Sequence, residues 1–584
     1  MKKRSLVFSA ILALLLVFAM VSCGGGKKAE PPKAAAAPKV LRLAEVSDTT
    51  TLNTQNDTEV VNAGIFNYCN SGLYLRVPND NGIGTKIIGN IASGDPVKID
   101  DFTWRVTIRK EAKWHNGKPI NADTFMYTYK MLIDPLLINK MANFFYDREI
   151  RIKNAADYYT QKQPGKKPVA WEDVGIKKID DYTLEFVTTQ RYQVEDVKRH
   201  FLDRSMVPVY EPLYEAGMNA TRTQTTYGSN LDSWVGCGPY ILKTWNRDAE
   251  RVYVKNPDHW LSDRYKFDRV EVRITPDRNA RVQMWERGEI DYLMLDADLL
   301  ATYRDDPRTH RSYRNTLHHI DVNTVNTTKA ILKSDNLRHA LYWAMDREAI
   351  AKLIDAVPMP IYINRLAGML HPKGPYRDTP AAKALVPPNY GYDPDKARQF
   401  FDAALKDGGV KSVSLELMYS DTTVFYKMVG EYLEQHLPKV FGPDKFSLTL
   451  KAVPTANFYA QKDFRVNPNN WELAYGGWSS TMSYILPYAA FQYFIEAYAA
   501  RPQPYISKEF DAFFASCQTE EVRFNPELLY QKSAELEALY LKYMINIPLW
   551  QPIDYEMFSD RIGLALKEFD PSISYGLWFS DIIK

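Results

Sequence analysis

The sequence predicts an α/β protein built from more than one domain. Runs in which apolar and polar residues alternate, as in β-strands, are interleaved with segments whose apolar residues recur at helical spacing. At 584 residues the chain is longer than one hydrophobic core usually supports, so we expect it to divide. Its centre, residues 236–260, has the pattern of a tight turn followed by a β-hairpin.

The central stretch reads GCGPYILKTWNRDAERVYVKNPDHW. Its glycines free the backbone and Pro239 fixes φ, so the chain can turn sharply before the first strand. Residues 240–245 and 251–255 are rich in aromatic and β-branched side chains, and residues 246–249 between them are typical of a turn. Pro257 then ends the second strand, because proline cannot extend a central ladder.

The N-terminal half repeats the alternation of strand and helix. Residues 102–109 form a predicted strand with Trp104, Val106 and Ile108 on one face. Asn121 is expected to cap the next helix, whose apolar side chains are Phe125, Met126, Tyr129 and Leu132. We also expect a helix over residues 62–75, and a polar loop over residues 150–170.

The C-terminal half has the same character. Leu337 and Leu341 mark a helix over residues 336–345, and Asp346 is expected to cap another through Ile354. Further helices are predicted at 396–405, 424–437, 507–516 and 526–543, and strands at 413–418, 447–453, 471–478 and 547–550. This order indicates an α/β unit.

The N-terminus predicts export. Three basic residues precede an apolar run over residues 6–19, the pattern of a signal peptide. Met20-Val21-Ser22-Cys23 is similar to a bacterial lipobox, which implies a lipoprotein signal peptide over residues 1–22 and lipidation of Cys23. The alternative is an uncleaved membrane anchor, for which the apolar run is short. Residues 23–38 are a flexible tether, since Gly, Pro, Lys and Ala without periodicity cannot form a core.

Composition narrows the function. The net charge of +2 gives no reason to expect nucleic acid as a partner. Cys69, Cys237 and Cys517 remain if Cys23 is lipidated, so at most one disulfide can form, and the sequence does not choose the pair. No cysteine pair has the spacing of a zinc site, so we expect neither metal nor cofactor.

Motifs of catalysis are missing from the sequence. It contains no G-x-S-x-G, no H-E-x-x-H and no phosphate-binding G-x-x-x-x-G-K-[ST]. His318 and His319 are adjacent in a predicted strand, where neighbouring side chains point to opposite faces, so they do not form a metal pair. We therefore expect a protein that is not an enzyme.

Several of these segments together resemble family 5 of the extracellular solute-binding proteins, the dipeptide, oligopeptide and nickel receptors of ABC importers. The segments that carry the resemblance are GCGPY with NPDHW, WHNGKP at 114–119, GEID at 288–291, NLRHALYWAMDREAI at 336–350 and GW at 477–478. The resemblance implies a two-lobed α/β fold like that of periplasmic binding proteins, class II and cluster C type, with an extra subdomain. The expected boundaries are lobe I at 39–316 (extra subdomain at about 76–170), lobe II at 317–548 and a return to lobe I at 549–584.

The resemblance also implies a function. The protein would be a lipid-anchored, monomeric receptor in the periplasm or on the cell surface. It would capture a peptide or peptide-like solute between its lobes and deliver it to an ABC permease. Alternatives are a receptor of the same fold for an oligosaccharide or metal chelate, a clamp used as a sensor or adhesion module, and a secreted hydrolase.

The expected ligand site lies at the end of the strand 471–478. Gly477 and Trp478 match the family's cleft strand end, and polar ligand groups would come from Ser479 and Ser480. Tyr68, Cys69 and Asn70 lie near the expected crossover between lobes. Peptide-binding members carry an aspartate soon after Gly-Trp that neutralises the ligand's amino terminus. Residues 479–484 here contain no acid, so a neutral or differently charged solute stays open.

Overall fold

The computed structural model describes residues 37–56, 63–146, 149–295, 297–478, 480–498 and 503–584. The predicted signal peptide, Cys23, most of the tether and Ser479 therefore lie outside the described residues. Residues 39–584 form one compact unit. Across the described ranges, no helix has both the length and the apolar character needed to cross a bilayer.

The predicted central hairpin is confirmed, and it belongs to a four-stranded sheet. β8 and β9 are antiparallel, β9 pairs with β10, and β1 runs parallel to β10. The strands, in sheet order, are β1 (Val40–Glu45), β10 (Arg269–Ile274), β9 (Glu250–Lys255) and β8 (Tyr240–Asn246). The helix after β10 is α7 (Arg278–Glu286).

The turn before the hairpin explains where the first helix stops. The carbonyl of Cys69 accepts the backbone N–H groups of Cys237 (3.0 Å) and Gly238 (2.8 Å). A Cβ on Gly238 would lie 2.4 Å from the carbonyl carbon of Cys69, so only glycine fits there. The predicted helix over residues 62–75 is therefore wrong at its C-terminal end. The observed α1 (Ala63–Cys69) ends at Cys69, because the carbonyl of that residue accepts these two hydrogen bonds, and a strand begins at Tyr74.

A second hydrophobic core surrounds a smaller antiparallel sheet. Trp104, Val106 and Ile108 are fully buried in it, as predicted, and Asn121 caps α2 by accepting the N–H of Thr124 (3.2 Å). The strands are β4 (Val97–Lys98), β5 (Thr103–Thr107), β7 (Thr183–Val187) and β6 (Ile176–Asp180), with the pair β2 (Tyr74–Pro78) and β3 (Thr85–Gly89). The helices are α2 (Ala122–Leu132), α3 (Ala142–Tyr146), α4 (Ala155–Thr160), α5 (Val194–His200) and α6 (Glu211–Ala216).

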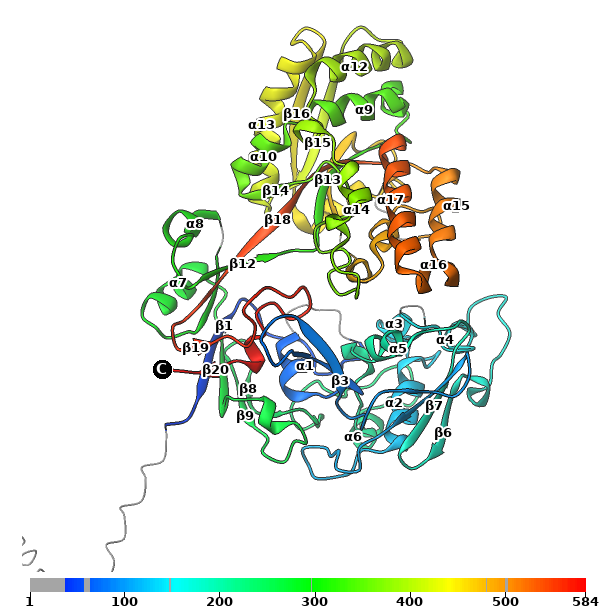
Figure 1. Cartoon of the computed structure of the whole chain (residues 1–584), viewed down its shortest axis with the longest axis vertical. Coiled ribbons are helices and arrows are strands. Elements are labelled where there is room, and N and C mark those ends of the chain that lie inside the picture. The colour runs from blue at the N-terminus through cyan, green and yellow to red at the C-terminus, as the bar shows by residue number, and fades with distance from the viewer. Residues whose placement is uncertain (1–36, 57–62, 147–148, 296, 479, 499–502) are drawn as a thin grey trace, which may run out of the picture. The chain divides into compact units, whose positions relative to one another are not determined.

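The largest sheet is organised around one long strand, β18 (Ile547–Phe558), which Figure 1 shows running past β13, β14 and β12. The N-terminal half of β18 pairs with β13 and β14, and its C-terminal half pairs with β11 and β12. The other strands are β11 (Tyr292–Leu295), β12 (Thr309–Tyr313), β13 (Leu317–Val322), β14 (Ala356–Pro358), β15 (Val413–Ser420), β16 (Phe446–Val453) and β17 (Leu473–Trp478). The chain thus contributes to this sheet twice near its centre, first at residues 309–322 and again in β18. The lobe boundaries at 316/317 and 548/549 stay predictions.

Helices cover the α/β part of this sheet. The predicted pair at 336–354 is confirmed, and Asp346 caps the second helix by accepting the N–H of Ala349 (3.0 Å). The helices of this half are α9 (Asp335–Ala344), α10 (Arg347–Ile354), α11 (Pro380–Ala384), α12 (Pro394–Gly408), α13 (Val424–Phe441), α14 (Thr455–Lys462), α15 (Lys508–Cys517), α16 (Glu520–Phe524) and α17 (Pro526–Tyr543). The last three lie together, with α15 and α16 both packed on α17 (Figure 1).

The NPDHW segment after the hairpin buries a neutral histidine. His259 is almost fully buried and its Nδ1 accepts the N–H of Leu261 (3.1 Å), so its Nε2–H donates to the Ser71 hydroxyl (3.0 Å). Its ring stacks on Trp260, whose Nε1 donates to Asn90 (3.0 Å). Burial lowers the pKa of His259 to about 3.

This pKa predicts how stability depends on pH. Between about pH 3 and 6.5 the unfolded chain binds a proton at His259 that the folded chain excludes, so the free energy of unfolding falls as pH is lowered through this window. Replacing His259 by Asn should remove about 2 kcal/mol of the stability lost between pH 7 and pH 5. Urea denaturation of both proteins at the two pH values measures this difference, and equal losses in the two proteins would contradict it.

Candidate functional site

The end of β17 contains two adjacent glycines, Gly476 and Gly477, at positions where a larger residue does not fit. A Cβ on Gly476 would lie 2.3 Å from Nε2 of His319, and a Cβ on Gly477 would lie 2.8 Å from Nδ1 of His318. The two histidines lie on neighbouring β13, which pairs with β17 over its whole length. The missing side chains on β17 thus leave room for imidazoles on β13, and these rings lie against Gly476, which is buried, and Gly477, which is half-buried.

One edge of this strand end has no strand partner. β15 pairs with β17 only at Leu473 and Ala474, so within the described residues no strand lies beside residues 475–478 on that side. Lys462 donates to the carbonyl of Tyr475 (2.8 Å) and forms an ion pair with buried Asp321 (2.6 Å), which fixes the start of the edge. A strand edge without a partner can pair with an extended chain.

Three cavities are lined by residues on the strand beside β17 or just after it in the chain, and none of residues 475–478 lines them. Cavity I, about 710 Å³, is lined mainly by apolar and aromatic residues, with His318 at its wall opposite Gly477. Cavity II, about 450 Å³, includes Thr316, which is next to Gly477, and Thr481, which follows Trp478 closely in the chain. Cavity III, about 300 Å³, also includes Thr481. The three together provide the volume of a small-molecule or peptide site.

The boundary between cavities I and II is an ion pair. Arg314 donates two hydrogen bonds to the carboxylate of Asp554, at 3.0 and 2.7 Å, and both residues line both cavities. Arg314 precedes β13 and Asp554 lies on β18, so this pair joins the two passages of the chain. Its bidentate geometry orients both side chains.

Cavity I has a polar corner in an otherwise apolar wall. Nδ1 of His318 is 2.9 Å from the hydroxyl of Tyr426, and the imidazole stacks on Trp550 at 5.0 Å. Burial lowers the pKa of His318 to about 3, so the ring is neutral at pH 7. It can therefore give or accept a hydrogen bond but offers no charge to a ligand.

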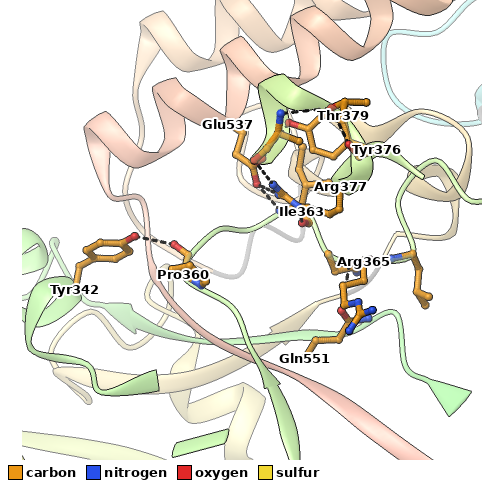
Figure 2. A network of polar contacts seen from close by, with 12 residues as sticks. Tyr342, Pro360, Ile363, Arg365, Tyr376, Arg377, Thr379, Glu537 and Gln551 are labelled. Atoms are coloured by element: carbon orange, nitrogen blue, oxygen red, sulfur yellow. Dashed lines mark hydrogen bonds and ion pairs between the residues drawn. The ribbon is translucent and has the colours of Figure 1, made fainter. Parts of the chain in front are cut away.

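Cavity III is walled in part by the long irregular segment 358–388, which is tied to α17. The buried carboxylate of Glu537 accepts the N–H of Ile363 (2.8 Å) and the hydroxyl of Tyr376 (3.0 Å), and it forms an ion pair with Arg377 (Figure 2). Arg377 also donates to the carbonyl of Ile363 (2.6 Å). These contacts close the segment into a loop, from which His371 reaches the cavity wall.

The predicted site residues are not all brought together. Trp478 is half-buried and packs on Tyr493, with ring centroids 4.9 Å apart. Ser480 is buried. Its carbonyl accepts a hydrogen bond from the side-chain amide of Asn315 (2.7 Å), and its hydroxyl has no hydrogen-bond partner. Tyr68 lies in the core against Tyr240 and Tyr253.

Asn70 lies elsewhere, at the wall of a separate cavity of about 230 Å³. Its side-chain amide nitrogen is buried without a partner. Cys69, Cys237 and Cys517 are all free and buried, and burial raises the pKa of Cys237 and of Cys517 to about 12. Such thiols are protonated at neutral pH and unreactive.

The two adjacent histidines contact different groups, as predicted. His318 contacts Tyr426, whereas Nε2 of His319 lies 3.3 Å from the carboxylate of Asp321. In the part of the chain that is described, no three His, Cys, Asp or Glu side chains form a group that could hold a metal ion.

Several residues of these cavities were not identified from the sequence. They are Asn315, Thr316, Arg314, Asp554, Glu556, Tyr484 and His371. Most of them lie on or beside the two passages of the chain, β12 to β13 and β18, whose pairing brings together residues more than 200 positions apart. The sequence predicted strands only around His318 and at 547–550, so it gave no signal for these residues themselves.

The chain has relatives among known proteins. The family model "Bacterial extracellular solute-binding proteins, family 5 Middle" matches residues 86–497. The chain is 27% identical to the dipeptide-binding protein DppE of Bacillus subtilis over 454 residues, covering 76% of this chain and 77% of that protein. It is 23% identical to the oligopeptide-binding protein OppA of the same organism over 465 residues, with the same coverage.

Solved structures share the fold. The structure of Listeria monocytogenes OppA bound to peptide aligns with a TM-score of 0.68 and 22% identity, covering 94% of this chain and all of that one. The predicted two-lobed fold of periplasmic binding proteins is therefore confirmed. The matched family is one of solute receptors and not of enzymes.

The loop network of Figure 2 can be tested by removing its central carboxylate. Replacing Glu537 by Ala should lower the free energy of unfolding by about 3–5 kcal/mol, because it leaves the mostly buried guanidinium of Arg377 without its counter-charge. Glu535 on the same helix is the control, since its half-exposed contact with Lys532 contributes at most about 1 kcal/mol. Urea denaturation measures both, and similar losses for the two variants would contradict the prediction.

Proposed function

Because the chain belongs to family 5 of the bacterial extracellular solute-binding proteins, we propose that it captures a peptide between its lobes and delivers it to an ABC permease. The observation that carries the peptide assignment is the edge of β17 at residues 475–478, beside which β15 no longer pairs, together with cavity I at His318 on the neighbouring strand and cavity II at Thr316 beside Gly477. An extended peptide can add to such an edge as another strand, while its side chains enter the neighbouring cavities. The names of the relatives, a dipeptide-binding and an oligopeptide-binding protein, support the same class of ligand.

The glycines of the edge favour binding of backbone over binding of side chains. Gly476 is buried and Gly477 is half-buried, and neither has a side chain, so an extended chain that pairs here would meet peptide groups alone, whatever its sequence. Trp478 at the end of the edge offers a flat apolar surface for one ligand side chain. We expect a receptor and not an enzyme, because the matched family is one of solute-binding proteins.

The site is tested by removing the indole of Trp478. A panel of synthetic dipeptides to pentapeptides, oligosaccharides and metal chelates is titrated by calorimetry, and peptides alone should bind. Trp478→Ala should weaken peptide binding about 10-fold or more, which corresponds to ~1.4 kcal/mol. Trp171→Ala is the control, because Trp171 is half-buried against Tyr158 and packs on the core around Trp104 and not at the end of β17.

Two results would contradict this function. If only oligosaccharides or chelates bind, the same fold serves another solute. If any peptide is cleaved during incubation, as read by mass spectrometry, the protein is a hydrolase and not a receptor.

The proposed location is outside the cytoplasm, with a lipid on Cys23 holding the protein to the membrane as a monomer. Replacing Cys23 by Ala should move the protein from the membrane fraction to the soluble fraction of bacterial cells, because the lipid is the proposed anchor. Immunoblotting of the two fractions measures the shift. A variant that stays in the membrane would favour the alternative, in which residues 6–19 remain as an uncleaved anchor.

A further inference from the structure

Glu556 is a buried carboxylate that lacks a cationic partner. Its side chain on β18 is 7% exposed and lines cavity II. The hydroxyl of Ser574 donates to both of its carboxylate oxygens, at 2.8 and 3.0 Å. Among the described residues no Lys, Arg or His lies within ion-pair distance of it.

Most other buried carboxylates among the described residues have a cationic partner. Asp291 contacts Arg42 (2.8 Å) and Arg561 (2.9 Å), Asp321 contacts Lys462 (2.6 Å), and Glu537 contacts Arg377. Asp570, like Glu556, has no cation within 4 Å, but it accepts the N–H and hydroxyl of Ser572 and the hydroxyl of Thr85, and it lines none of the described cavities. Glu556 alone in this group faces a cavity.

The lining of cavity II carries one negative charge more than it carries positive charges. Its lining contains three charged side chains: Arg314, Asp554 and Glu556. Arg314 is engaged by both carboxylate oxygens of Asp554, so the negative charge of Glu556 is not balanced. Opposite it on β12, His310 packs on Phe558 and Tyr575, and burial lowers the pKa of His310, so this ring is neutral at pH 7.

The pKa of the Glu556 carboxyl group is raised above its ordinary value. Burial is the largest cause of the raised pKa of Glu556, and the nearby carboxylate of Asp554 adds to it. A cation entering cavity II would remove both penalties, because it would restore the neutral balance that the other buried carboxylates have.

We propose that the carboxylate of Glu556 binds a primary ammonium group of the captured solute in cavity II. This inference rests on the proposed function, since the ammonium belongs to the peptide. Cavity II includes Thr316, whose side chain lies against Gly477, so this cavity lies beside the end of β17. A divalent metal fits less well, because only two carboxylates line the cavity and Arg314 holds one of them.

The serine contact is held by a constrained turn. Ser574 has a positive φ of 51°, a conformation that non-glycine residues rarely adopt, and it exchanges two backbone hydrogen bonds with Asp570 at 3.0 and 2.8 Å. This turn keeps the hydroxyl of Ser574 on Glu556. The carboxylate is therefore oriented before any ligand arrives, which lowers the entropy cost of binding.

The test compares peptides that carry an ammonium group with matched peptides that do not. Three synthetic mixtures of dipeptides to pentapeptides are used: free peptides without Lys or Arg, the same peptides N-acetylated, and N-acetylated peptides containing Lys. Native mass spectrometry reads the bound fraction. The wild-type protein should prefer a mixture with an ammonium group about 10-fold or more over the mixture with none. The two ammonium mixtures distinguish an α-ammonium from a lysine side chain.

Glu556→Gln should abolish this preference while binding of the N-acetylated mixture without Lys is unchanged, since the amide keeps the shape and the serine contact. Glu568→Gln removes the same charge from an exposed glutamate twelve positions further along the chain and should keep the preference. A wild-type protein that binds all mixtures alike, or a Glu556→Gln variant that keeps the preference, would overturn the inference alone. If the wild-type protein binds no peptide, the proposed function fails and this inference fails with it.

Discussion

The structure depends on the continuous pairing of β18. Its N-terminal half carries Leu549 and Trp550 into the main α/β core, and its C-terminal half carries Tyr555 and Met557 into a second core beside β11. Because one strand enters both cores, its hydrogen-bond register with β13 and with β12 cannot slip independently. Asp554, which lies between the two cores, and Glu556, which alternates with Tyr555 and Met557, are consequently fixed in position. Because β18 lines cavities I and II, its fixed register also fixes the shape of these cavities.

Local patterns predicted local structure well. The hairpin at 240–255, the cap at Asn121 and the cap at Asp346 each depend on residues within a few positions of one another, and each is present. The predicted helix over residues 62–75 was wrong at its end for the opposite reason. Its last carbonyl is taken by residues 237 and 238, and no pattern within the helix itself announces that contact.

The same distinction applies to the candidate site. Gly477 and Trp478 were predicted because a short motif marks the end of β17, and their role in binding stays a prediction, since neither residue lines cavity I or II. The family resemblance implies a carboxylate within a few residues of Trp478, and the sequence has none there. Glu556 lies 78 positions later and reaches cavity II through the pairing of β18 with β12, which sequence alone does not specify. Tyr68 was selected for its position near a crossover, but its ring is needed in the core, where it packs edge-on against Tyr240.

The buried network under β17 explains why an open edge can be a binding surface and not a weak point. Lys462 contacts both the carbonyl of Tyr475 and the carboxylate of Asp321, and Asp321 is next to His319, which fills the space beside Gly476. The backbone of the edge is therefore held from below by charge-assisted hydrogen bonds that are shielded from water, where such contacts are strongest. An edge that is rigid before the ligand arrives loses little conformational entropy on binding, so its few backbone hydrogen bonds contribute more fully to affinity. Sequence-independent contacts on a rigid edge, combined with a fixed charge in cavity II, would recognise peptides as a class while leaving their side chains free to vary.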